Sequence, residues 1–219
     1  MRQIGTIEGC DLWEDGDGRV YFVADADIDA DGANGQDGAE VAYRGDDTGS
    51  EALANGGMAI KNGKVVCVTS GARDIAILGK DNEPRVYPGG MIATKTWYAH
   101  PGLEVDDPAA YVDAQTVPYI VVPPLVVKET IGVGCLARVT WGGTSVDCVV
   151  ADRGPKAKIG ESSIAAAEAL GIPSSPRNGG RLQKDIEYEL WPGARRRGTW
   201  LRTSARVTIH NPPAPPRHR

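Results

Sequence analysis

The sequence has no run of about 18 consecutive apolar residues, so no segment is expected to cross a membrane as a helix. Its first residues lack the apolar core of a secretory signal peptide, which leaves the compartment open. The three histidines are scattered and the four cysteines form no C-x-x-C pair, which argues against a zinc site. G-x-S-x-G, H-E-x-x-H, Walker and strand-linked G-x-G-x-x-G motifs are also missing. We therefore expect a chain without a cofactor and without a membrane partner.

Carboxylate is the group that the sequence has in excess. Its net charge is −5, but residues 1–60 hold fourteen acidic side chains and only three arginines, a local net charge of −11. The C-terminal part is basic, with arginines at 195–197, 202, 206, 217 and 219. The acidic half argues against nucleic acid as the main partner and favours a cation or a polycation.

Short apolar runs separated by Gly and Pro turns predict a mainly β protein with one or two short helices and long loops. Residues 59–60 and 64–69 are expected to form a hairpin around Asn62-Gly63, and residues 92–98 alternate as a strand does. The one convincing helix spans 162–170. We expect one monomeric domain over 1–209, a long surface excursion at 33–57 and a disordered Pro- and Arg-rich tail at 210–219.

An acidic strand follows residues 20–24. A period of two places four aspartates on one face and Ala26, Ile28 and Ala30 toward the core; the four are Asp25, Asp27, Asp29 and Asp31. Three interpretations compete. In the first, the segment begins an EF-hand loop, but the twelfth position then falls on Gly38 instead of Glu. The second is a solvated acidic edge. In the third, which we favour, the row of aspartates lines the subsites that bind a polycationic ligand.

Two further carboxylates lie at the ends of expected elements. Asp152 follows the β-branched run 149–151, and Glu161 opens the expected helix after a Gly154-Pro155 turn and a basic loop. Nine positions apart, they are able to face each other across a cleft, as the two carboxyl groups of a glycosidase do. The alternative is structural, because Asp152 suits a turn and Glu161 suits a helix N-terminus.

Five segments together resemble a known family. The first, 149–165, reads Val-Val-Ala-Asp-Arg-Gly-Pro-Lys-Ala-Lys-Ile-Gly-Glu-Ser-Ser-Ile-Ala and is followed by the related run 168–172. The others are the acidic motif 25–33, Tyr-Pro-Gly-Gly at 87–90, Pro-Tyr-Ile-Val-Val-Pro at 118–123 and Pro-Arg-Asn-Gly-Gly at 176–180. In this order they resemble the chitosanases of glycoside hydrolase family 75. The missing secretion signal departs from that family.

The resemblance implies a six-stranded double-psi-type β-barrel and endo-hydrolysis of chitosan with inversion. By motif, Asp152 is then the general base and Glu161 the general acid, and the four aspartates of 25–31 bind the amines of a cationic aminosugar polymer. The helix dipole would lower the pKa of Glu161, whereas neighbouring acids would raise it. Alternatives are a hydrolase of partly acetylated chitin or peptidoglycan, a non-catalytic polysaccharide-binding module, and a calcium-stabilised module built on 25–31.

Overall fold

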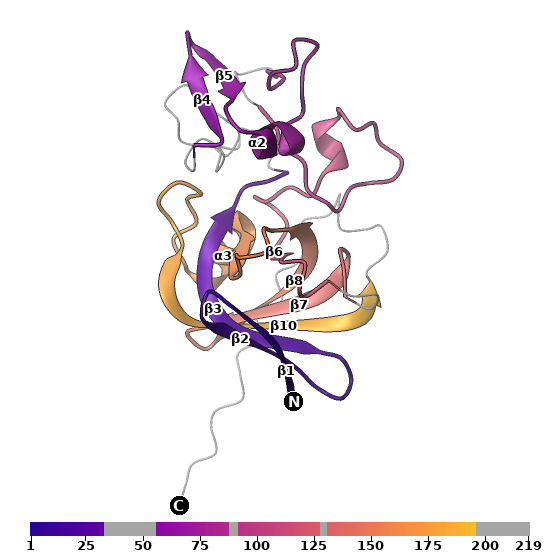
Figure 1. Ribbon diagram of the computed structural model, residues 1–219, viewed down its shortest axis with the longest axis vertical. Coiled ribbons are helices and arrows are strands. Elements are labelled where there is room, and N and C mark those ends of the chain that lie inside the picture. The colour runs from indigo at the N-terminus through magenta and orange to yellow at the C-terminus, as the bar shows by residue number, and fades with distance from the viewer. Residues whose placement is uncertain (33–55, 88–91, 128–130, 196–219) are drawn as a thin grey trace, which may run out of the picture.

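A computed structural model describes residues 1–32, 56–87, 92–127 and 131–195 (Figure 1). Most of the expected excursion at 33–57 and the whole tail at 210–219 lie outside these residues. The centre of the described chain is a closed barrel of six strands in the order β3-β10-β7-β8-β6-β9, with β9 paired back to β3. Their bounds are β3 (Val20–Asp29), β6 (Tyr119–Val122), β7 (Cys135–Trp141), β8 (Thr144–Arg153), β9 (Glu161–Ser163) and β10 (Arg181–Arg195). The predicted mainly β fold with a six-stranded barrel is confirmed.

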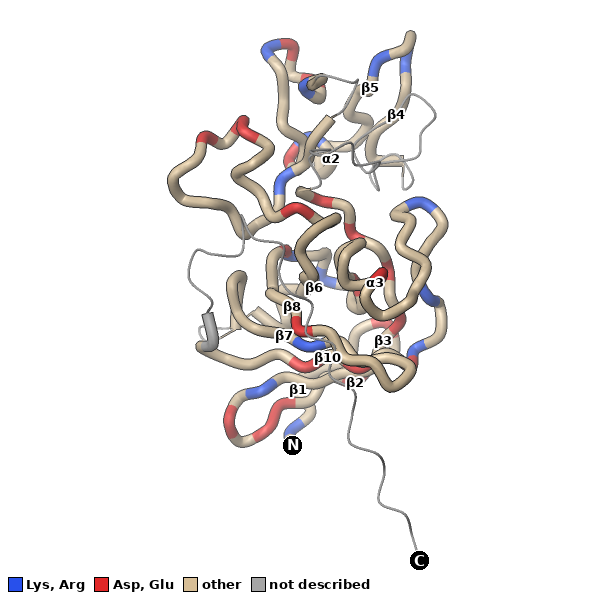
Figure 2. The backbone as a smooth tube through the Cα atoms, turned by 180° about the vertical axis from the view of Figure 1, so that it is seen from behind, with Lys and Arg blue, Asp and Glu red and all other residues tan. Residues whose placement is uncertain are grey.

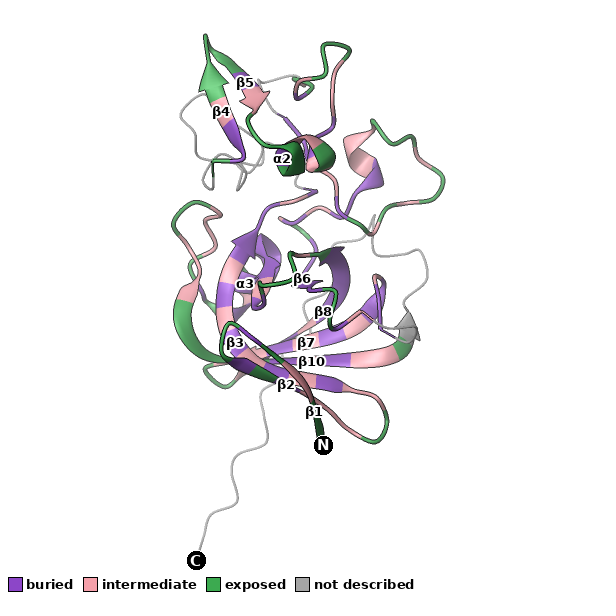
Figure 3. Cartoon of the chain, viewed as in Figure 1, coloured by how far each residue is buried: buried purple, intermediate pink, exposed green. Residues whose placement is uncertain are grey.

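Strand β3 shows why these residues form a barrel wall. Every second side chain from Val20 to Ile28 is buried, and Phe22 stacks on Tyr188 of β10 with ring centroids 4.8 Å apart. The residues between them, Asp25 and Asp27 included, face outward as the period of two predicts. Two further strands, β1 (Arg2–Ile7) and β2 (Cys10–Glu14), extend the sheet from the open edge of β3. Figure 3 shows buried and half-buried residues alternating along the strands of the barrel.

The shortest strand closes the barrel. Strand β9 pairs in parallel with β3 and antiparallel with β6, whose four residues are all buried. The Ser163 hydroxyl, at the end of β9, donates to the Val117 carbonyl (2.9 Å) and accepts from the Tyr119 N–H (3.0 Å). It also accepts from the Ala166 N–H (3.2 Å), which caps the next helix. One side chain therefore joins β6, β9 and a helix start.

Two α-helices occur among the described residues, and neither is long and apolar enough to cross a membrane. Helix α3 (Ile164–Leu170) ends at Gly171 in a left-handed conformation. The sequence predicted this helix from 162, with Glu161 at its start. That placement is wrong: Glu161 belongs to β9, because backbone pairing with two neighbouring strands holds residues 161–163 extended. Helix α2 (Ser70–Ile75) was not predicted.

A small cap lies over one end of the barrel (Figure 1). We use this name for residues 56–87 and 92–112. It contains the predicted hairpin of β4 (Met58–Lys61) and β5 (Lys64–Cys67), turned by Asn62 and Gly63 with positive φ, together with α2 and the 3-10 turn η2 (Pro108–Ala110). Residues 92–98 form one isolated bridge, at Thr94, rather than the predicted strand. The cap has its own apolar clusters, one around Met58 and Ile92 and another around Ile77 and Tyr111.

The two buried serines of β9 test how the barrel is closed. Ser163→Ala removes a helix cap and leaves a buried N–H and a buried carbonyl without their partner, so we expect a loss of about 3 kcal/mol in the free energy of unfolding. Ser162 is equally buried, and no side-chain hydrogen bond within the described residues involves its hydroxyl. Ser162→Ala is the matched control and should change stability by less than about 1 kcal/mol in urea unfolding. Equal losses for both variants would contradict this role of Ser163.

Candidate active site

Asp152 and Glu161 flank the same residue of the barrel. Val121 on β6 is paired with Asp152 on β8 and with Glu161 on β9. Adjacent strands are about 4.8 Å apart, so the Cα atoms of the two acids stand roughly 10 Å apart across β6. The fold thus places two carboxylates that are nine positions apart in the sequence at the same end of the barrel, beneath the cap.

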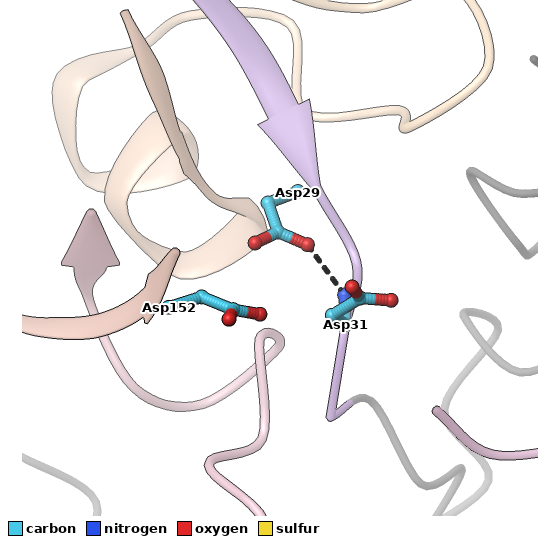
Figure 4. A group of neighbouring side chains, drawn as sticks. All are labelled: Asp29, Asp31 and Asp152. Carbon is cyan, nitrogen blue, oxygen red and sulfur yellow. Dashed lines mark hydrogen bonds between the residues drawn. The ribbon is translucent and has the colours of Figure 1, made fainter. Parts of the chain in front are cut away.

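Two more carboxylates complete the group at the end of β3. Asp29 accepts a hydrogen bond from the Asp31 backbone N–H (2.7 Å), and both side chains lie near Asp152 (Figure 4). Each of the three residues offers a carboxylate oxygen, and these oxygens lie within 4.8 Å of one another. Asp29 and Asp152 are only 3% and 5% exposed. We call Asp29, Asp31, Asp152 and Glu161 the carboxylate cluster.

The cluster lines a cleft between the cap and the barrel, and Figure 2 shows acidic positions of the chain between α2 and the barrel strands. One pocket, of about 410 Å³, is lined by Glu161, Asp29 and Val121 and, on the cap side, by residues of α2; we call it the Glu161 pocket. A second, of about 320 Å³, contains Asp152 and is lined on the cap side by residues 95–97; we call it the Asp152 pocket. Asp31, Ile75 and Arg153 line both pockets, so the two adjoin each other at the cluster.

Burial controls the protonation of Asp152. Loss of water, followed by the charges of Asp29 and Asp31, raises the pKa of its carboxyl to about 9. Two backbone N–H groups oppose this shift, since those of Arg153 (2.7 Å) and Trp97 (3.2 Å) donate to its Oδ1 atom. They hold the side chain in one orientation and favour its ionised form.

Glu161 has a different environment. Burial, then the charges of Asp29, Asp27 and Asp152, raises its pKa well above the ordinary value, and only Lys158 acts in the opposite direction. No hydrogen bond within the described residues involves its carboxyl group. Because Glu161 lies on a strand, the helix-dipole effect considered from the sequence does not apply. When the cluster carries few protons, Glu161 is thus well suited to hold one.

The structure divides the four aspartates of 25–31. Asp29 and Asp31 line the cleft, whereas Asp25 and Asp27 lie outside both pockets. Asp27 forms an ion pair with Lys158 (2.6 Å) from the basic loop before β9. The side chain of Asp25 is partly buried, and desolvation raises its pKa. The binding of substrate by Asp25 and Asp27 stays a prediction, and the sugars that they bind would lie outside the cleft.

A cation is the other ligand that this cluster suits. Asp29, Asp31 and Asp152 together are able to offer three oxygens to a divalent ion. An EF-hand is a poor description of them, because its first ligand would be Asp27, which lies within β3 and pairs with Lys158. The acids brought together come from the end of β3, the turn that follows it and the end of β8, not from one loop.

Sequence reasoning missed two residues of the cleft. Trp97 lines the Asp152 pocket, and the Arg153 guanidinium lies over its ring at 4.4 Å from the centroid. The strand predicted for 92–98 gave no signal for this placement, because Lys95, Thr96 and Trp97 all line the pocket and the segment is not a regular strand.

Comparison with models of known protein families found no match to this chain, and a search of curated protein sequences found no match either. The interpretation of the site therefore depends on its geometry and on the sequence motifs.

The raised pKa of Asp152 predicts that its charge opposes folding. Its folded pKa lies above the unfolded value of about 4, so the stability that its protonated form supplies is complete below about pH 4 and is lost as the pH rises toward 9. Asp152→Asn keeps an oxygen for both N–H groups and removes the charge. We expect the variant to exceed the wild type by more than about 1 kcal/mol in urea unfolding at pH 8, and to match it at pH 4.

Asp185→Asn is the control, because removal of this charge should change stability in the opposite direction. A hydrogen bond from Arg181 lowers the pKa of Asp185, so this carboxylate stabilises the fold at neutral pH and loses that effect as the pH falls. Its variant should be less stable than the wild type at pH 8. If Asp152→Asn is less stable than the wild type at pH 8, the conclusion that the charge of Asp152 opposes folding is contradicted.

Proposed function

We propose that this protein is an inverting, endo-acting chitosanase, with Glu161 as general acid and Asp152 as general base. The observation that carries the proposal is the placement of both carboxyl groups on either side of Val121, in one cleft that also contains Asp29 and Asp31. The resemblance of five sequence segments to glycoside hydrolase family 75 points to the same two residues.

The geometry suits inversion. The carboxyl groups of inverting enzymes stand about 6.5–9.5 Å apart, which leaves room for a water molecule, and a Cα separation of roughly 10 Å is compatible with that range. Glu161 gives its proton to the glycosidic oxygen as the bond to the anomeric carbon breaks. Asp152, in its ionised form, takes a proton from the water whose oxygen attacks that carbon from the opposite face.

The charge of the cleft suits a polyamine. Asp29 and Asp31 add two carboxylates beside the reacting pair, and an ammonium group on a glucosamine ring would offset their mutual repulsion. An uncharged polysaccharide would leave this repulsion in place. The cleft therefore favours chitosan over neutral polymers.

The first test replaces the acid. Glu161→Gln removes the transferable proton but keeps the shape of the side chain, so we expect hydrolysis of soluble chitosan to fall at least about 100-fold while its Kd changes less than about twofold. Reducing ends give the rate, and calorimetric titration gives the Kd. Proton NMR of the wild-type products should show the inverted anomer first.

Glu168→Gln is the matched control, because Glu168 is exposed on α3 outside both pockets. Its activity should equal that of the wild type. Substantial turnover by Glu161→Gln would overturn the assignment of the acid. Binding of chitosan without release of reducing ends would favour a non-catalytic module, and preferential cleavage of chitin or peptidoglycan a different aminosugar polymer.

The pH profile tests the coupling within the cluster. The charge of Asp29 raises the pKa of both Asp152 and Glu161, so Asp29→Asn should lower both and move the bell-shaped profile of kcat/KM to lower pH by roughly one unit. Asp25→Asn, on the same strand but outside the cleft, should leave the profile in place. A shift to higher pH in Asp29→Asn, or equal shifts in both variants, would contradict this coupling.

A further inference from the structure

The backbone controls where the carboxyl group of Glu161 lies. Two N–H groups hold the side chain of Asp152, whereas no hydrogen bond within the described residues involves the carboxyl group of Glu161. The direction of its side chain therefore depends on how the chain enters β9. Residues 154–160, which we call the connecting loop, lead from β8 to β9 and so join the two reacting carboxylates.

Barrel strands hold both ends of the connecting loop. The Gly154 N–H donates to the Val122 carbonyl of β6 (3.1 Å), and the Gly160 carbonyl accepts from the Asp27 N–H of β3 (2.7 Å). Lys158 adds an ion pair with the same aspartate (2.6 Å), but both side chains are about half exposed, so this pair contributes little. Another anchor comes from outside the barrel.

Glu8 supplies that anchor from the turn between β1 and β2. Its carboxylate accepts a hydrogen bond from the Ile159 N–H (3.2 Å), two positions before Glu161, and the Ile159 side chain is buried in the barrel core. The Lys184 ammonium group on β10 donates to the Glu8 carbonyl and holds the turn against the barrel. A residue beyond the six barrel strands therefore contacts the loop that leads to the general acid.

Glutamate is an unusual residue for this turn. Glu8 and Gly9 have φ of 51° and 76°, the conformation of a two-residue hairpin turn in which Asn-Gly is a preferred pair. The hairpin of β4 and β5 has that pair, Asn62-Gly63, with φ of 52° and 74°. Among the described residues, the other non-glycine residue with positive φ is Asn82. Glu8 thus adopts a conformation that disfavours glutamate, and its hydrogen bond to Ile159 accounts for the choice.

We propose that Glu8 is a positioning residue for the general acid: its carboxylate fixes the end of the connecting loop and thereby the place from which Glu161 reaches the glycosidic oxygen. Glu8 lies outside both pockets and acts through the Ile159 N–H. Release of the loop at Ile159 would let Glu161 move relative to Asp152, and small displacements of a reacting group lower the rate more than the binding. This inference rests on the proposed function and adds to it a residue from outside the barrel.

Two variants of Glu8 separate positioning from folding. Glu8→Asn suits the left-handed turn better, but its side chain is shorter and should lose the Ile159 N–H. We expect a melting temperature equal to or above that of the wild type, while kcat on chitosan falls roughly 5- to 20-fold and KM changes less than about twofold. Glu8→Gln keeps an oxygen within reach and should retain more than about half of the wild-type kcat. Arg2→Gln, which removes an exposed ion pair with Glu14 on the same hairpin, is the matched control and should leave kcat and KM unchanged.

The leaving group shows whether Glu8 acts through Glu161. Dinitrophenolate departs without a proton, so a substrate that carries it needs little help from the general acid. Glu8→Asn should therefore hydrolyse the dinitrophenyl glycoside of a glucosamine oligomer at nearly the wild-type rate, although it is slow on chitosan. Hydrogen exchange measures the contact itself: the Ile159 amide should exchange at least about fivefold faster in Glu8→Asn, and at the wild-type rate in Arg2→Gln.

An unchanged kcat of Glu8→Asn on chitosan, with hydrolysis by the wild type intact, would overturn the role of Glu8 and leave the proposed function standing. Equal losses on chitosan and on the dinitrophenyl glycoside would also refute this role, because the defect would then not lie in proton transfer. An equal loss of kcat in Glu8→Gln and Glu8→Asn would contradict the need for an oxygen at this position. Faster exchange of the Ile159 amide in Glu8→Asn, together with a wild type that cleaves neither substrate, would overturn the proposed function and leave Glu8 as a structural contact only.

Discussion

The candidate site depends on the pairing of three residues, Glu161–Ser163, with two strands at once. These residues bond in parallel to β3 and antiparallel to β6, and so close the barrel. The same pairing sets Glu161 beside Asp27 and opposite Val121, whose other neighbour is Asp152. Gly160, with φ of 87°, allows the chain to enter β9, because a Cβ atom there would lie 2.7 Å from the Asp25 carbonyl oxygen. The strand pairing that closes the barrel therefore also assembles the site.

Closure concentrates negative charge at one end of the barrel. Four carboxyl groups meet beneath the cap, and desolvation is the largest cause of the raised pKa of three of them, Asp31, Asp152 and Glu161. Such an arrangement opposes folding when the groups ionise, and the buried strands around it supply the compensating stability. Burial and mutual repulsion of acidic groups are usual where a carboxyl group must keep its proton near neutral pH.

Patterns in the chain predicted the walls of the barrel well. The period of two that runs from the acidic segment back into residues 20–24 and the Asn62-Gly63 hairpin both appear as expected, because each depends on neighbours within a few residues. The start of α3 was misplaced, since Glu161 and Ser162 have no local preference that overrides two partner strands. Helix α2 was missed because it is short and only Ala72 is buried, which leaves no clear helical periodicity.

The site also has features that the sequence predicted and features that only the tertiary structure decided. Residue types and order single out Asp152, Glu161 and the acidic run, because a strand end and a row of alternating aspartates are visible in one dimension. Which aspartates face the cleft is decided in three dimensions: Asp29 and Asp31 lie under the cap, while Asp27 turns to Lys158. The raised pKa values and the position of Trp97 depend on burial and on charges from distant segments. No local pattern encodes these quantities, because they arise only when the barrel closes and the cap covers it.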